Sequence, residues 1–154
     1  MTRDQTMYTA KEVAEYIICR CNLTDVFVSN LKLQKLLYLV QVEYLRYFGR
    51  PCFSDDFEAW NVGPIVSDVY NRYCGFGGSG IILKAEPKIA GQDEKFIDEI
   101  VQRWKNAYPW DMSRKTAYAG SPWDVTYDNG RGSHRIIRKE LIKELEKAKE
   151  VAYA

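Results

Sequence analysis

One segment, residues 30–48, constrains the fold more than any other part of the chain. Its apolar side chains recur every three or four residues, the period of a helix with one buried face: Leu33, Leu36, Leu37, Val40, Tyr44 and Phe48. Ser29 or Asn30 can cap its start, while Gly49 and then Pro51 end it. We therefore expect a long helix at the centre of the core. Its charged side chains lie off the apolar stripe and are expected to face solvent: Lys32, Lys35, Glu43 and Arg46.

Five further helices are predicted from apolar spacing and from residues that start or end helices. They cover residues 10–22, 64–73, 93–108, 111–119 and 139–151. A capping box formed by Thr9 and Glu12 begins the first. Gly63-Pro64 is typical of a helix entry, and Asp93 is expected to be an N-cap.

The intervening segments indicate turns and extended chain. Cys52–Trp60 is compatible with a short ribbon, and Ile81–Leu83 with a strand. The glycine-rich segment Cys74–Gly80 and the segment Asp124–His134 are expected to be loops. The prediction is a mainly α, compact single domain over residues 1–154, with about five or six helices and a possible short β ribbon.

The amino-acid composition limits which partners and which cellular compartment are expected. The chain has 22 basic and 21 acidic side chains, so no global field attracts nucleic acid or an anionic membrane. The longest apolar region is interrupted by charges, and the first residues lead into no apolar signal sequence. Four cysteines without zinc-binding spacing suit a reducing compartment. We expect a cytoplasmic protein without a membrane partner.

No residue pattern in the sequence predicts a catalytic or metal-binding site. His134 is the sole histidine and has no carboxylate or cysteine partner close in sequence, so we predict no catalytic residue, metal ion or cofactor. Two alternatives stay open. One is a metal-dependent hydrolase or nuclease using Asp55, Asp56 and Glu58, and the other is a regulator that binds DNA through its basic C-terminal region.

An ordered series of motifs resembles the Panacea domain, a family that includes SocA-like antitoxins and phage-associated GepA-like proteins. The similarity extends roughly from Thr9 to Trp123. The residues that carry it form one long run and several short ones, and most of them are expected to be structural: Leu31, Lys32, Leu33, Gln34, Lys35, Leu36, Leu37, Tyr38, Glu58, Trp60, Gly63, Pro64, Tyr70 and Trp123.

The resemblance implies a non-enzymatic antitoxin that neutralises a cognate protein toxin by direct binding, with a protease such as ClpXP as a further partner. One departure is visible, because many members have histidine after the threonine where this chain has Ala117 after Thr116. Among the motif residues, we expect Glu58 to form a buried ion pair with Lys32 or Lys35.

The partner surface is expected on the two loops that the helical core does not explain. Loops vary while the scaffold stays fixed, and aromatic and arginine side chains anchor many protein interfaces. The predicted contact residues are Phe76, Tyr127, Arg131 and Arg135.

Overall fold

The computed structural model describes residues 7–153, with side chains up to residue 147. Over this range it contains seven α-helices: α1 (Ala10–Leu23), α2 (Asn30–Phe48), α3 (Ser67–Tyr73), α4 (Gly91–Trp104), α5 (Pro109–Thr116), α6 (Pro122–Tyr127) and α7 (Lys139–Tyr153). Three short strands form one sheet: β1 (Phe57–Trp60), β2 (Gly63–Ile65) and β3 (Ile136–Ile137). The prediction of a mainly helical fold with a short β ribbon is confirmed.

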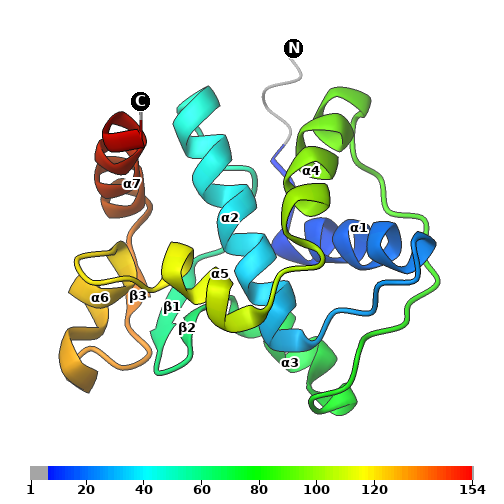
Figure 1. Ribbon diagram of the computed structural model, residues 1–154, viewed down its shortest axis with the longest axis horizontal. Helices are drawn as coiled ribbons and strands as arrows, with labels where there is room; N and C mark the ends of the chain where they lie inside the picture. Colours follow the sequence, from blue (N-terminus) through cyan, green and yellow to red (C-terminus); the bar gives the residue numbers. More distant parts are fainter. Residues whose placement is uncertain (1–6, 154) are drawn as a thin grey trace.

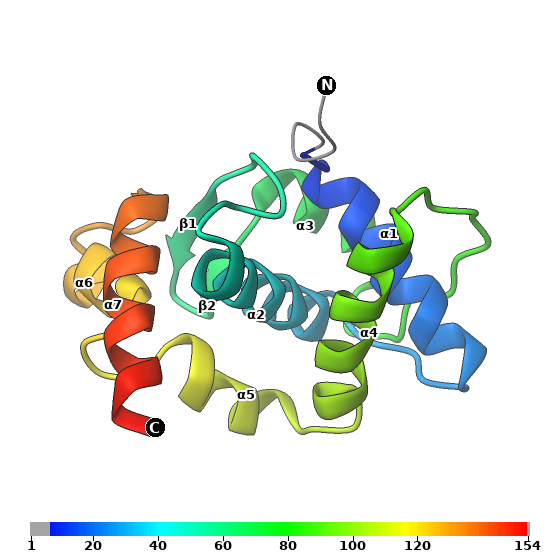
Figure 2. The ribbon, with the colours of Figure 1, turned by 90° about the horizontal axis from the view of Figure 1, so that it is seen from above.

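The helix α2 lies at the centre of the molecule. Seen from above, it is surrounded by the other elements, with α1 and α4 on one side, α6 and α7 on the other, and α5 along its flank (Figure 2). Its start is capped by the Ser29 hydroxyl, and its end by Gly49 in the left-handed conformation at φ 73°. Burial continues around the whole helix from Leu33 to Val42, and Phe48 alone of the predicted stripe is half exposed.

The sheet lies at the end of the molecule that α6 and α7 also occupy (Figure 1). Its order is β2-β1-β3 and both pairings are antiparallel. Gly63, expected at a helix entry, instead pairs with Trp60 in the sheet, at a φ of 120° that only glycine adopts readily. The next helix, α3, therefore begins later, at Ser67. The strand β3 was not predicted from the sequence.

Two further expectations are corrected. Asp93 is not the N-cap of α4, which starts at Gly91; its buried carboxylate instead accepts hydrogen bonds from the hydroxyls of Tyr8, at 2.6 Å, and Tyr44. Residues Ile81–Leu83 form no strand, because Ile81 makes a single backbone hydrogen bond to Val28 and the Leu83 amide donates to a side chain.

The segment expected as a loop after residue 123 contains a helix. Pro122 is the first residue of α6, and the Ser121 hydroxyl accepts a hydrogen bond from the Asp124 amide at 3.0 Å, which caps its start. The helix α5 likewise begins two residues before its predicted start, at Pro109. Both corrections come from prolines that were interpreted as terminators and are first residues of helices.

Candidate partner-binding site

The polar residues of the family motif on α2 point into the molecule. Gln34 is buried and accepts a hydrogen bond from the Val66 amide at 2.9 Å, while its own amide group donates to Asn30. Lys32 donates to the backbone carbonyl of Lys105. The expectation that the charged side chains of this helix face solvent is thus wrong for its lysines. It is also wrong for Glu43 and Arg46, which pair with each other at 3.2 Å and are only 19% and 13% exposed. The two lysines attach the segments around α2 to the central helix.

Lys35 is the most unusual of these side chains. It is only 6% exposed, and its ammonium donates to the carbonyl of Val62 at 3.3 Å. Burial lowers the pKa of Lys35 below the ordinary lysine value, and burial also lowers the pKa of Lys32. A β-carbon at Gly63 would lie 3.6 Å from the Lys35 Nζ atom and 4.0 Å from the Ala117 side chain. The position that departs from the family pattern, Ala117, therefore lies in this buried environment.

Glu58 forms no ion pair with either lysine in the described part of the chain, contrary to expectation. Its carboxylate accepts from the indole nitrogen of Trp60 at 2.9 Å and lies 3.5 Å from the Ser67 hydroxyl. Both lysines reach backbone carbonyls on other segments instead. Glu58 therefore orients a tryptophan.

That tryptophan belongs to an aromatic cluster on the sheet. The ring of Trp60 stacks on His134 at 4.5 Å between centroids, and meets Tyr70 edge to face at 5.1 Å. Trp123 donates from its indole nitrogen to the Trp60 carbonyl at 2.6 Å and stacks on Tyr127 at 4.9 Å. The motif residues Trp60, Tyr70 and Trp123, far apart in sequence, thus join α3, α6 and the sheet.

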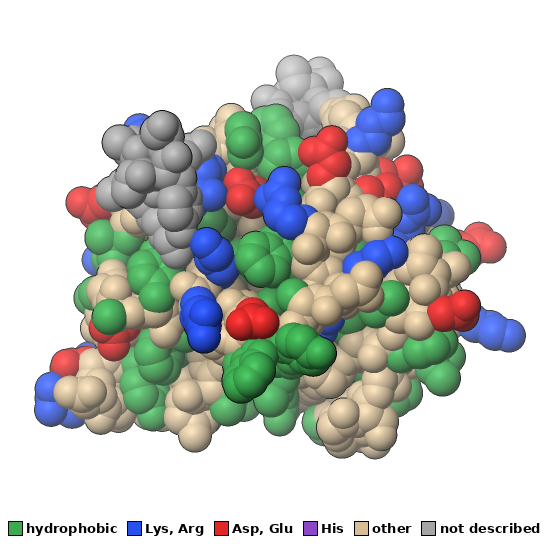
Figure 3. Space-filling model, viewed as in Figure 1, with side chains coloured by type: hydrophobic (Ala, Val, Ile, Leu, Met, Phe, Trp, Pro, Cys, Tyr) green, Lys and Arg blue, Asp and Glu red, His purple; other side chains and the backbone are tan. Residues whose placement is uncertain are grey.

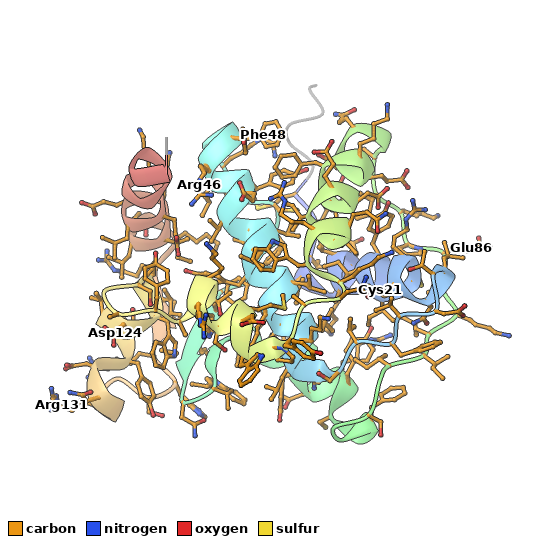
Figure 4. The ribbon with its side chains drawn as sticks, viewed as in Figure 1. Cys21, Arg46, Phe48, Glu86, Asp124 and Arg131 are labelled. Atoms are coloured by element: carbon orange, nitrogen blue, oxygen red, sulfur yellow. The ribbon has the colours of Figure 1, made fainter. Side chains whose placement is uncertain are left out.

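The predicted contact residues do not form one surface. Phe76 lies in the short 3-10 turn after α3, at the end of the molecule away from α6 (Figure 1). Arg131 lies at the opposite end, beyond α6 (Figure 4), and is held by Asp128 at 3.0 Å. Tyr127 is half-buried by its stacking on Trp123, and Arg135 is exposed beside β3. Tyr127, Arg131 and Arg135 therefore share one end of the molecule, without Phe76.

Two exposed aromatic residues were missed as candidates for contact. Tyr108 and Trp110, at the start of α5, are 68% and 69% exposed and meet edge to face at 6.3 Å. Tryptophan side chains are highly buried on average, so the residue type alone favours the core for Trp110. The sequence signal that could have placed Trp110 on the surface is Pro109, which is typical of the first residue of a helix. A helix that starts there and buries Met112 and Thr116 leaves Trp110 on its outer side.

The side chains considered for catalysis are each engaged with a different structural partner. Asp55 accepts from the Ala10 amide at 2.8 Å, Asp56 pairs with Lys139 at 2.6 Å, and Glu58 is engaged with Trp60. Among the described residues, no three His, Cys, Asp or Glu side chains gather as metal ligands do. Burial raises the pKa of the thiols of Cys19, Cys21 and Cys52, which disfavours the nucleophilic thiolate.

Two comparisons of sequence show the family of the chain. The sequence profile of the family "Antitoxin SocA-like, Panacea domain" matches residues 33–124, more than half of the chain, and the protein belongs to this family. It is similar to Antitoxin SocA of Caulobacter vibrioides (strain NA1000 / CB15N), with 30% identity over 151 residues, covering 87% of this chain and 78% of the relative. No solved structure matches the chain. Within residues 7–153, no helix has the length and apolar character needed to cross a membrane.

Proposed function

We propose that the protein is an antitoxin that neutralises a cognate protein toxin by forming a complex with it, without catalysing a reaction. Support comes from its family and from the relative named Antitoxin SocA. We also propose that it works in the cytoplasm, where its four free cysteines would stay reduced.

The observation that carries this proposal is how the motif side chains are used. Gln34, Lys35 and Glu58 are engaged in internal hydrogen bonds, so the motif builds a scaffold. Aromatic and arginine side chains outside the motif remain exposed: Phe76, Tyr108, Trp110, Arg131 and Arg135. A fixed scaffold with exposed aromatic and arginine side chains suits a protein that binds another protein.

Coexpression tests the proposal. The gene product of the adjacent open reading frame is induced in cells with and without this protein, and growth and copurification are measured. The expected result is growth arrest that coexpression relieves, together with a stable complex of the two purified proteins. Toxicity without relief, or relief without any complex, would contradict neutralisation by binding.

The loop residues remain one proposed contact surface. Alanine variants of Phe76, Tyr127, Arg131 and Arg135 test it, because truncating an interface anchor costs about 2 kcal/mol or more of binding energy. Tyr127→Ala also removes the ring stacked on Trp123, so its unfolding must be compared with that of the wild type. Variants that fold normally but bind the toxin weakly would support this surface.

A role in delivering the toxin to a protease such as ClpXP is a finer proposal. Its test is the half-life of the toxin in cells with and without the protease while this protein is present. Rapid, protease-dependent loss of the toxin would support delivery, whereas a stable complex would indicate neutralisation by binding alone.

Metal-dependent hydrolysis by the purified protein would support the competing function of a hydrolase or nuclease. Salt-sensitive DNA binding would support the competing function of a DNA-binding regulator.

A further inference from the structure

The outer side of α5 carries a surface that the scaffold does not use. We define the α5 patch as Tyr108, Trp110 and Arg114. Trp110 and Arg114 are four residues apart on one helix and both are exposed, so they lie on the same side. Figure 3 shows hydrophobic side chains at the front of the molecule over α5, with both acidic and basic side chains beside them.

The backbone that carries the two rings is anchored before any partner arrives. Pro109 stands between them as the first residue of α5 and restricts the backbone. On the inner side of the same helix, Met112 and Thr116 are fully buried, and α5 packs against α2. Because the helix is anchored and the rings contact each other, little conformational entropy remains to be lost on binding.

The chain segment that carries the patch has a positive net charge. Between residues 102 and 116 the chain carries four basic side chains and one acidic one, a net charge of +3 in a protein whose total is +1: Arg103, Lys105, Arg114 and Lys115 against Asp111. Such a surface attracts an acidic partner and repels a basic one.

A hollow of about 350 Å³ lies between α1 and α4, where Lys105, Val101 and Asp98 line it. Asp98 is already paired there with Arg20 at 3.0 Å, so the α5 patch is defined without this hollow. Exposed rings beside Arg114 suit a short segment in which acidic residues flank a large apolar residue.

We infer that the α5 patch is a docking surface for an acidic protein segment that contains a large apolar side chain. This inference rests on the proposed function in one respect, that the segment belongs to the bound toxin. Nucleic acid fits less well, because proteins that stack bases on aromatic rings combine them with a positively charged groove along the strand. The total charge of this chain is only +1.

The test selects peptides without knowing the toxin. A displayed library of random 12-residue peptides is selected on the wild-type protein, and binders are measured again on Trp110→Ala, Tyr108→Ala and Arg114→Glu. Val125→Ala, on the exposed side of α6, is the matched control. The expected result is a set of peptides with acidic residues around an aromatic or aliphatic one. Their affinity falls roughly 30-fold on Trp110→Ala and stays unchanged on Val125→Ala.

Several outcomes would overturn the inference. They are a selection without binders, binders that are basic, binders indifferent to Trp110 and Arg114, and oligonucleotides of DNA or RNA that bind instead and lose affinity on Trp110→Ala. A second arm asks whether a selected peptide competes with the toxin for the protein. Competition supports the link to the proposed function. Binding at the patch without competition retains the docking surface and rejects the toxin as its occupant.

Discussion

Gln41, buried at the centre of α2, accepts a hydrogen bond from the backbone amide of Cys52 at 2.8 Å and donates to the Phe53 carbonyl at 2.9 Å. One side chain thus satisfies two backbone groups of the segment that follows α2 and leads into the sheet. Buried backbone groups without partners are costly, so this residue fixes the path of that segment.

Replacing Gln41 by leucine keeps the size of the side chain and removes these hydrogen bonds, together with the longer one that Gln41 accepts from the Phe53 amide at 3.4 Å. We expect Gln41→Leu to lower the free energy of unfolding by about 2–4 kcal/mol, because two buried backbone groups lose their partners. Urea unfolding measures the difference. Gln92→Leu, exposed in the first turn of α4, is the control and should stay within about 0.5 kcal/mol of the wild type. Equal stability of Gln41→Leu and the control would contradict the role of Gln41.

Glu58 offers a test that separates an ion pair from a hydrogen bond to an indole. Glutamine at this position keeps an oxygen that can accept from Trp60, so Glu58→Gln should change the free energy of unfolding by less than about 1.5 kcal/mol. Breaking a buried ion pair would cost about 3–5 kcal/mol. Asp56→Asn, which breaks the exposed pair with Lys139, sets the scale for a surface interaction. A loss above 3 kcal/mol for Glu58→Gln would restore the ion-pair hypothesis.

Lys35 makes stability depend on pH. Burial lowers its pKa in the folded protein below 10.5, the ordinary value that the unfolded chain retains. Between the lowered value and 10.5, the unfolded chain binds more protons than the folded chain, so the free energy of unfolding rises with pH in that window. At lower pH both states are protonated and the cost of burying the charge is fully present.

The measurement compares the wild type with Lys35→Met in urea between pH 7 and pH 10.5. We expect the wild type to gain stability relative to Lys35→Met as the pH rises, because methionine does not titrate. Lys143→Met is a matched control, since Lys143 also donates to a backbone carbonyl, that of Gly49 at 3.1 Å, but is exposed. Parallel pH profiles for the wild type and Lys35→Met would show that Lys35 does not have a lowered pKa.

The parts of the fold predictable from sequence are those encoded locally. Thr9 with Glu12, Ser29 and Gly49 mark helix ends through contacts within three or four residues, and all of them act as predicted. Gly63-Pro64 failed as a helix start because both residues are paired across the sheet with β1. Asp93 failed as a cap because its partners, Tyr8 and Tyr44, are distant in sequence. Local patterns do not contain such pairings.

The candidate site was harder to predict for the same reason. The polarity of Lys35 indicated solvent, whereas its position beside the turn between β1 and β2 is set by tertiary packing. Tryptophan is a residue type that is mostly buried, whereas the register of α5 on α2 turns Trp110 outward. Residue type alone therefore favours the wrong environment for both side chains, because the packing of other elements on the central helix determines where they lie.

The segment after α6, interpreted from sequence as a surface loop, packs closely against the backbone of α6 at Gly132. This residue is buried, and its amide donates to the Tyr127 carbonyl at 2.9 Å. A β-carbon there would lie 1.8 Å from the Thr126 carbonyl oxygen, a distance that no real contact reaches. Because the obstacle is the backbone of α6, alanine cannot be accommodated by rotating a side chain.

We expect Gly132→Ala to lower the free energy of unfolding by about 1–3 kcal/mol, as overpacking in well-packed regions does. The loop must also move, and His134, whose amide donates to the Ala59 carbonyl at 2.7 Å, moves with it. The stacking of His134 on Trp60 should therefore weaken, which changes the near-ultraviolet circular dichroism of the tryptophan. Gly91→Ala is the control, because nothing lies within 4 Å of a β-carbon there and alanine favours a helix. If Gly132→Ala retains wild-type stability and an unchanged tryptophan signal, the close approach of α6 to this loop is not a feature of the folded protein.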